Sequence, residues 1–504
     1  MNKIIKILFC SIITLIYPQN VDSLSFTQLL IDDKAYLIPD YEVGSSEFEI
    51  EYLDKRKFFF IDFHIGYIDN DDTYRLNLSP SLNLKNLKFK INLDYAFNSD
   101  SLSFSNIDDV FSFFERIEYF KYSFFDHRVN LYLGEIRNFT IGHGYLVNNY
   151  NNTLNYPLSR KLGFIMNLTN SNQSVKYDLF ISNLRDLINK GGIVANKFTF
   201  LFSNDFPLTF GFGHITDLNQ FSKFDDIQLD FDRKVDAFQG DFTFPIMDNT
   251  NEKLYLIGEI CGIDYPEKRF YIRVDDDQFT NDKKSRNGIW GIAFPGMLYN
   301  SDNVKFKLTA NYNSAVYTPY YFNSTYDFEN IRFRQYNIQE NEALYEDEAE
   351  LLQQFATSNS TLYVPKDMYG MINQAENTYP TFGFSTNLDL KINKHNNFSF
   401  HYSFFKNISE VNNSFYNTFM FNSSNFIKIV YFPTKFDIYF SKNFFKASQY
   451  YNYDENLAYG FSLDMMLYES IYLIGSLKHV FYDINYDGKI DLVPYVNIGL
   501  NYKY

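Results

Sequence analysis

The sequence predicts an all-β protein in which about twenty antiparallel strands close into an up-and-down barrel that crosses a membrane. Three observations predict this fold. Apolar and polar residues alternate at every second position in many segments, which is the period of a strand with one apolar and one polar face. These segments are about 9 to 13 residues long, close to the ~9–11 residues with which a tilted strand crosses a bilayer. Short and long connections also alternate along the chain.

The segment at residues 86–97 shows the alternation clearly. Its apolar residues fall on one face, whereas Lys88, Lys90, Asn92 and Asp94 fall on the other. The composition, with 56 Phe and 43 Tyr, fits the same fold because aromatic residues favour strands and form girdles at both membrane interfaces. We expect strands near residues 57–68, 74–83, 86–97, 112–123, 128–137, 161–169, 174–183, 194–203, 207–215, 234–244, 252–262, 287–296, 303–313, 380–392, 396–406, 425–432, 434–442, 457–467, 470–482 and 491–503.

The connections between these strands fall into two sets. The short set includes residues 84–85, 170–173, 203–206, 393–395 and 469–470. The long set comprises residues 98–111, 138–160, 216–233, 263–286, 314–379, 407–424 and 443–456, with exceptions to the alternation at 69–73 and 483–490. Membrane barrels have short periplasmic turns and long extracellular loops. An even strand number, within a range of about 16 to 22, then places both ends of the barrel on the periplasmic side.

The last ten residues, 495–504, read as the closing strand of the barrel. Val496, Ile498, Leu500 and Tyr502 share one face, and the segment ends on the aromatic residue Tyr504. A closing strand of this kind resembles that of bacterial outer-membrane β-barrel proteins. The resemblance implies a porin-like protein in the Gram-negative cell envelope, surrounded by outer-membrane lipid and lipopolysaccharide. It also implies that the barrel-assembly machinery recognises residues 495–504.

The N-terminal residues predict export. Residues 1–23 combine Lys3 and Lys6 with a short apolar run at 7–17 and small residues near Ser23, the pattern of a cleaved signal peptide. Residues 24–56 are expected to form a periplasmic lead-in, and residues 57–504 the barrel. The net charge of −16 makes nucleic acid an unsuitable partner.

The longest loop, 314–379, carries the first candidate site. Glu346, Asp347 and Glu348 belong to an acidic run without basic residues. A loop of this length is usually functional or disordered. One interpretation is an acidic constriction that favours cations, and the alternative is a solvated outer surface.

Basic residues flank another long connection. Arg137 ends one predicted strand, and Arg160 and Lys161 stand where the chain enters the next. These side chains are candidates to line the pore, although they could equally pair with acidic loop residues. The connection between them contains closely spaced glycines around His143 and an Asn-rich run at 148–152. That cluster could bind sugar through aromatic stacking and amide hydrogen bonds, or it could be an ordinary Asn-rich loop.

Oxygen-bearing side chains recur in residues 483–491. Asp483, Asn485, Asp487 and Asp491 surround a glycine, which resembles the calcium loops of EF-hand and dockerin type. Pro494 stands where such loops have their bidentate carboxylate, so a polar hairpin loop is the alternative. Apart from possible Ca²⁺, no cofactor is expected.

Catalysis has little support in the sequence. The seven His residues are scattered, and the sequence contains no His-Glu-x-x-His motif, no Gly-x-Ser-x-Gly motif and no cluster of Cys and His. His401 with Ser399 and Ser403 has suitable residue types, but such proximity is common in Ser-rich strands. We therefore expect no enzyme but a channel for passive or ligand-selective passage of small polar solutes. The alternatives are an adhesion, assembly or export platform with a plugged lumen, and a soluble secreted β-protein.

Overall fold

The computed structural model describes residues 59–68, 73–84, 86–97, 102–104, 110–125, 128–154, 161–202, 207–222, 233–249, 251–265, 268–273, 278–284, 289–315, 317–335, 361–366, 380–393, 396–408, 415–429, 431–446, 451–468, 471–483 and 489–503. All of them belong to one compact unit, Tyr41–Tyr504. The expected signal peptide and periplasmic lead-in lie outside the described residues. Within this part of the chain, no helix is both long and apolar enough to span a membrane.

One large antiparallel sheet dominates the structure. Its strands are β1 (Phe59–Ile68), β2 (Thr73–Asn83), β3 (Leu87–Ile91), β4 (Leu93–Phe97), β5 (Leu102–Phe104), β6 (Ile117–Phe124), β7 (Val129–Gly134), β8 (Gly163–Thr169), β9 (Val175–Ile181), β10 (Ile193–Leu201), β11 (Thr209–Asp217), β12 (Val235–Asp248), β13 (Glu252–Asp264), β16 (Ile289–Ser301), β17 (Val304–Asn313), β20 (Thr381–Asn393), β21 (Asn396–Asn407), β22 (Phe415–Ile429), β23 (Phe432–Lys446), β24 (Leu457–Tyr468), β25 (Ile471–Tyr482) and β26 (Asp491–Lys503).

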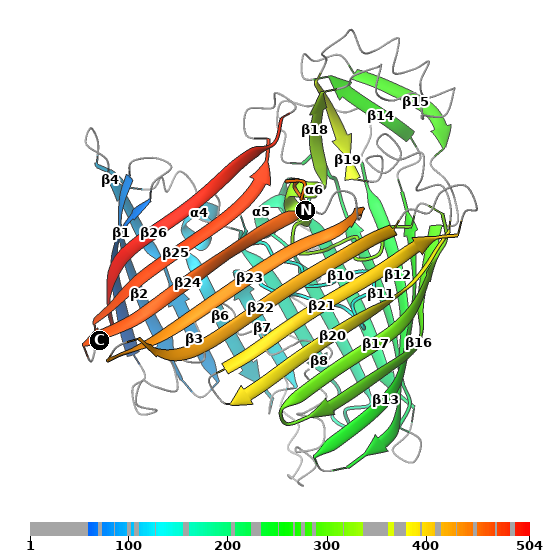
Figure 1. The fold of residues 1–504 in the computed structure, drawn as a ribbon, viewed down its shortest axis with the longest axis horizontal. Coiled ribbons are helices and arrows are strands. Elements are labelled where there is room, and N and C mark those ends of the chain that lie inside the picture. Colours follow the sequence, from blue (N-terminus) through cyan, green and yellow to red (C-terminus); the bar gives the residue numbers. More distant parts are fainter. Residues whose placement is uncertain are drawn as a thin grey trace. The chain divides into compact units, whose positions relative to one another are not determined.

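The sheet closes into a ring. Apart from the β3–β5 region, each strand of this sheet pairs with the next one in the sheet, and β1 pairs with β26 from Asp62↔Lys503 to Ile68↔Asn497. Among the described residues the sheet has 22 named segments. β3 and β4 both pair with β2 and form one strand, and β5 pairs only with β4. About twenty strands thus surround the lumen, and the predicted antiparallel up-and-down barrel is confirmed (Figure 1).

A smaller sheet is built from two of the long connections. β14 (Lys268–Arg273) and β15 (Gln278–Lys284) follow β13, and β18 (Ile331–Gln335) and β19 (Thr361–Pro365) follow β17. Their order is β15-β14-β19-β18. In the part of the chain that the structure describes, three short helices also lie in connections: α4 (Val110–Phe114), α5 (Leu184–Ile188) and α6 (Tyr326–Glu329).

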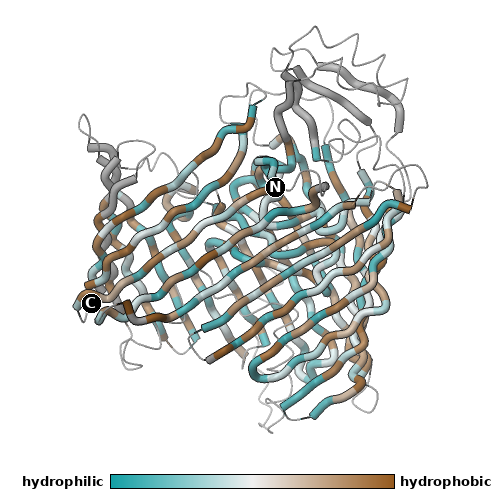
Figure 2. Tube along the Cα trace, in the orientation of Figure 1, coloured by the Kyte–Doolittle hydropathy of each residue, from teal (hydrophilic) through white to brown (hydrophobic). Residues whose placement is uncertain are grey.

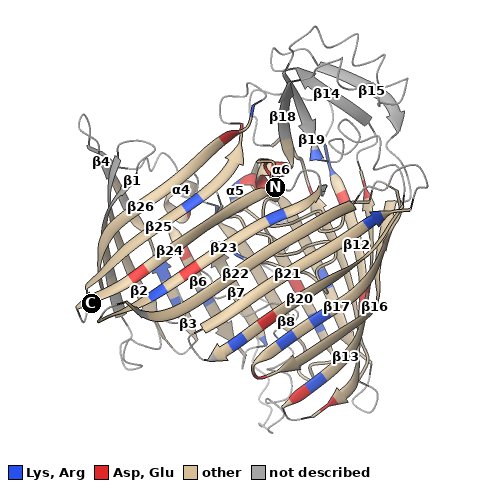
Figure 3. Cartoon of the chain, viewed as in Figure 1, with Lys and Arg blue, Asp and Glu red and all other residues tan. Residues whose placement is uncertain are grey.

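The two faces of the barrel wall differ as the alternation predicts. Hydrophobic and hydrophilic residues alternate along the strands (Figure 2). On β13, Ile260 is 52% exposed on the outer face, whereas Glu259 is 3% exposed on the inner face. On β26, Ile498 and Leu500 point outward and Asn501 inward. Charged residues are separated along strands that are mostly uncharged (Figure 3). An apolar outer face on a closed sheet is the arrangement that satisfies every backbone group within lipid.

Some element boundaries differ from the predicted ones. The segment near 112–123 begins with α4, because its Phe-rich start winds into a helical turn before β6. β22 and β23 are both longer than predicted and extend into residues assigned to the loops at 407–424 and 443–456. The long loop 314–379 contains α6, β18 and β19. The short and long connections still alternate between the two ends of the barrel.

Candidate functional site: the occluded lumen

The candidate site is the lumen, whose inner wall is polar and charged. On β10 and β12, Lys197 and Asp241 form an ion pair at 2.6 Å, and both side chains are buried. Glu259 of β13 lies nearby, and Lys307 of β17 points to the same region. Charged groups buried in this way need partners, because an unpaired buried charge is strongly unfavourable.

The connection after β7 turns into this lumen. Gly134 has φ +146°, and a Cβ there would lie 2.3 Å from the Glu118 backbone oxygen, so the exit from β7 requires glycine. Gly142 and Gly144, with φ of +62° and +79°, flank His143 and form a tight turn. This turn is the tip of the inserted connection.

Glu259 holds that tip against the wall. The His143 N–H donates to Glu259 Oε2 at 2.7 Å, and the Tyr145 N–H approaches the same carboxylate at 3.3 Å. Lys307 Nζ donates to the His143 carbonyl at 2.5 Å. The N–H groups of His143 and Tyr145, two residues apart, thus converge on one carboxyl group. The wall supplies acceptor oxygens and the Lys307 ammonium, and the loop supplies the complementary backbone groups.

The connection after β17 lies beside this loop. Val147 and Phe322 form a parallel β-bridge. Tyr320 N donates to Tyr145 O at 2.9 Å, and Phe322 N donates to Leu146 O at 3.1 Å. Leu146, Tyr321 and Phe322 are fully buried. We call residues 135–154 and 317–331 together the lumen insert.

Polar contacts anchor the second half of the insert. Tyr326 OH donates to Asp217 at 2.6 Å. Lys366 forms an ion pair with Glu329 at 2.9 Å and donates to Tyr321 O at 2.7 Å. Asn443 of β23 donates to Thr325 Oγ1 at 2.9 Å. These contacts join α6 both to wall strands and to the residue that follows β19.

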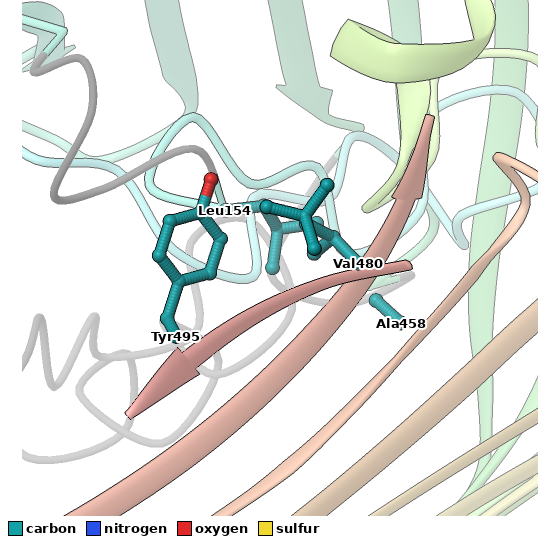
Figure 4. Close-up of a cluster of buried hydrophobic side chains, with 5 residues drawn as sticks. Leu154, Ala458, Val480 and Tyr495 are labelled. Carbon is teal, nitrogen blue, oxygen red and sulfur yellow. The ribbon is translucent and has the colours of Figure 1, made fainter. Parts of the chain in front are cut away.

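The insert also reaches the strands near the barrel's closure. Leu154 packs with Ala458 of β24, Val480 of β25, and Val493 and Tyr495 of β26 (Figure 4). Lys478 of β25 donates to the Thr153 carbonyl at 3.4 Å. Because other insert residues contact β11, β13 and β17, the insert extends across the lumen from one part of the wall to another.

Two of the predicted pore residues lie in or against the insert. Arg137 pairs with Glu135 at 2.9 Å. Lys161 pairs with Asp327 at 2.5 Å, which joins the start of β8 to α6. Burial alone would lower the pKa of Lys161, but the Asp327 and Asp186 carboxylates outweigh it and raise that pKa. Lys161 is therefore a fixed cation.

The other predicted site residues are described only in part. Arg160, Glu346, Asp347 and Glu348 lie outside the described residues, so the acidic constriction stays a prediction. Of the possible calcium ligands, Asp483 is buried and Asp491 begins β26, whereas Asn485 and Asp487 also lie outside. In the described ranges, no three His, Cys, Asp or Glu side chains gather as a metal site requires.

Sequence reasoning did not identify Glu259 or the inward path of residues 135–154. Glu259 stands at an inward position of an alternating strand, which is a signal that it faces the lumen. Nothing local indicates that its carboxylate meets the backbone of His143, which is 116 residues away. The closely spaced glycines around His143 were the only local signal for that turn.

His143 is neutral in this position. Burial lowers its pKa from 6.5 to about 4, against the opposing effect of Asp241. Its Nε2 lies 2.9 Å from the Phe242 carbonyl and therefore carries the proton. The nearby cations Lys197 and Lys307 also favour a neutral His143 ring, because they would repel a charged one.

Comparison with known proteins gives likenesses in structure only. No family model matches the sequence, and no curated protein matches it. Wzi, described as an outer-membrane, carbohydrate-binding β-barrel involved in group 1 capsule assembly in Escherichia coli, is 11% identical, with 90% of this chain and 86% of Wzi covered and a TM-score of 0.32. The FrpB iron transporter from Neisseria meningitidis is 8% identical, with coverage of 90% and 82% and a TM-score of 0.35. Pseudomonas aeruginosa OprD is 7% identical, with coverage of 88% and 94% and a TM-score of 0.32.

The closed sheet itself defines the class of the protein. The ring leaves no open edge, its outer face is apolar, and its inner face is polar. Single-chain barrels of this construction are membrane proteins of the bacterial outer-membrane type. The chain has the fold of an outer-membrane β-barrel.

Proposed function

We propose that the protein is an outer-membrane channel for small polar solutes, in which the lumen insert narrows the passage. The observation that carries this proposal is the attachment of the insert to the inner wall by a few polar contacts around Glu259. A barrel of about twenty strands encloses more space than its own side chains fill. An insert held by polar contacts narrows that space and leaves hydrophilic groups along the remaining path.

The charged groups along the wall support passage of polar solutes. Lys197 with Asp241, and Lys161 with Asp327, place both signs of charge next to the insert. Paired charges provide hydrogen-bonding groups without a strong net field. Arg137 and Lys161 are therefore the described residues that we propose contact solute or position the insert.

A second function is favoured by two other observations. Ile136, Leu146, Tyr321 and Phe322 are fully buried, so parts of the insert pack like a protein core. The connections after β13 and β17 also form their own four-stranded sheet. A plugged barrel that carries a surface platform for adhesion, assembly or export would have both features.

Conductance of the full chain in planar lipid bilayers separates the two functions. We expect steady ohmic currents from the wild-type protein, and larger currents when residues 139–150 are replaced by a short Gly-Ser linker. If the wild-type protein carries no current but the linker variant conducts, the plugged platform is favoured. If neither protein conducts, the channel proposal is wrong. Heat-modifiable migration in gels establishes that each variant is folded.

A further inference from the structure

A row of hydroxyl groups crosses the inner wall beneath the insert. Thr309 of β17, Ser385 of β20, Ser403 of β21 and Thr418 of β22 are register partners from strand to strand. Their exposed fractions are 4%, 3%, 0% and 0%. We call these four residues the hydroxyl row. It is uncharged, although Lys307 lies only two residues before Thr309 on β17.

Tyr320 of the insert covers this row. Its ring meets the His401 ring edge to face, with centroids 5.1 Å apart, and its hydroxyl lies beside Ser385 and Ser403. Tyr320 itself is 2% exposed. Its φ is +57°, a conformation that is strained for a bulky residue and is found where a structure enforces it. The insert therefore holds this side chain against the wall at a conformational cost.

Hydrogen bonding at this contact is incomplete. The His401 Nδ1 lies 2.5 Å from Asn387 Oδ1, and since that oxygen only accepts, Nδ1 carries the proton and Nε2 is left as an acceptor. Within the described chain, the buried His401 Nε2 has no hydrogen-bond partner, and the Tyr320 hydroxyl has only the Ser385 and Ser403 hydroxyls beside it. Thr309 and Ser385, by contrast, bond to each other at 2.6 Å. Buried polar atoms without partners are uncommon, and they require a cause such as a bound molecule.

We propose that the hydroxyl row with His401 and Asn387 is a binding site for an uncharged, polyhydroxylated solute such as an oligosaccharide, and that Tyr320 covers the site when the insert is in place. This inference rests on the proposed channel function and names its solute class. Displacement of Tyr320 by solute would uncover the wall and loosen the insert at the same time.

The chemistry of the wall selects this class of solute. A sugar hydroxyl both donates and accepts, so it can donate to His401 Nε2 and accept from Ser403. Aromatic rings of the insert offer an apolar surface to the C–H face of a sugar, since the ring centroids of Tyr317 and Tyr320 lie 5.8 Å and 6.0 Å from that of Tyr145. A charged solute at the hydroxyl row would lose its water, and the nearest cation, Lys307, is already held by the His143 carbonyl and lies close to Glu259.

Binding is tested by calorimetric titration of the detergent-solubilised full chain with maltotriose, and with trigalacturonate as a charged comparison. When Tyr320 covers the site in most molecules, the apparent affinity equals the intrinsic affinity multiplied by the fraction of molecules in which the site is uncovered. Tyr320→Ala should therefore raise the affinity for maltotriose by about tenfold. Tyr320→Phe keeps the covering ring and should bind like the wild type. Trigalacturonate should bind to none of these three proteins.

A second substitution identifies the wall as the binding surface. Ser403→Ala, added to Tyr320→Ala, should lower the affinity about tenfold, the usual effect of losing one buried hydrogen bond. Ser462→Ala, a serine of β24 beside Asp437 and away from the row, is the matched control and should leave binding unchanged. If Tyr320→Ala does not fold, the single variant Ser403→Ala in the wild-type background is compared with Ser462→Ala instead.

Three outcomes would overturn the inference. In the first, maltotriose binds to no folded variant. In the second, trigalacturonate binds as tightly as maltotriose. In the third, Ser403→Ala leaves maltotriose binding unchanged. In each case the unpartnered His401 Nε2 holds ordered water only. Calorimetry does not depend on conductance, so sugar binding without current contradicts only the channel proposal. If the protein conducts but maltotriose neither alters the current nor gives a calorimetric signal, only the sugar site is contradicted.

Discussion

At the scale of single residues, the position of the insert depends on Glu259. Its carboxylate receives N–H groups from His143 and Tyr145, and Lys307 binds the carbonyl between them. The alternation in the local sequence predicts that Glu259 faces inward. It does not predict that Glu259 binds the backbone of His143 and Tyr145. That partner is set by the folded path of a loop distant in sequence, and local periodicity does not encode this path.

Substitution of Glu259 should release the tip of the loop. Glu259→Gln keeps the shape of the side chain but replaces one acceptor oxygen with an amide nitrogen, and the loss of one hydrogen bond costs about 0.5–1.5 kcal/mol. We expect more frequent current fluctuations and faster proteolysis within residues 139–150. Glu252→Gln, an exposed position on the same strand whose carboxylate receives the Tyr299 hydroxyl, is the control. Equal behaviour of the two variants would contradict the role of Glu259.

Acid should also release the tip through His143. Its pKa is about 4 when the loop is docked and about 6.5 when the ring is in water. Between these values the undocked state binds more protons, so docking is favoured as pH rises and weakens as pH falls from about 6.5 to about 4. The contribution of His143 is measured as the difference between the wild-type and His143→Gln profiles of current fluctuations over this range. His143→Gln should lose that part of the pH dependence, and an identical profile would contradict the assignment.

At the scale of elements, the strands were predictable and their inner connections were not. The alternation in residues 86–97 predicted β3 and β4, because lipid on the outer face imposes the same apolar requirement on every strand. Residues 135–154 carry no comparable periodicity, since their burial results from contacts with many strands. The acidic run around Glu346 lies outside the described residues, so its proposed role stays a prediction.

The exit from β7 provides a test at this scale. Gly134→Ala would place a Cβ 2.3 Å from the Glu118 oxygen, at φ +146°, and strain of this kind costs about 1–3 kcal/mol. We expect a lower thermal midpoint for loss of the heat-modifiable form. Gly475→Ala on β25, where no atom lies within 4 Å of the added Cβ, should be tolerated. Equal midpoints for the two variants would show that the β7 exit can relax.

At the scale of the whole molecule, the outer face is the part that the sequence predicts best. Ile260, Phe212 and Ile498 are all more than half exposed, which in water would favour aggregation and in lipid is the expected state. The class of protein follows from this surface and from the closed ring. The solute does not follow from them, because barrels of one class carry different inserts.

A charge on this outer face should destabilise the barrel. Ile260→Lys would place an ammonium in the lipid, at a cost of about 2–4 kcal/mol near the middle of the bilayer. We expect a clear fall in the yield of heat-modifiable protein. Tyr451→Lys, in the connection after β23 where the side chain is 85% exposed, should have no effect. If both variants fold equally well, the face around Ile260 does not contact lipid.

The pairing of β1 with β26 has a consequence for the order of assembly. β1 is synthesised hundreds of residues before β26. Until β26 has been made, neither strand can form the pair that closes the ring. During that interval two rows of backbone groups would stand unsatisfied in oil or be open to other chains. Insertion strand by strand, without a protein that occupies those rows, is therefore unfavourable. We therefore propose that a chaperone accompanies the chain and that another protein acts as a template where β1 and β26 pair.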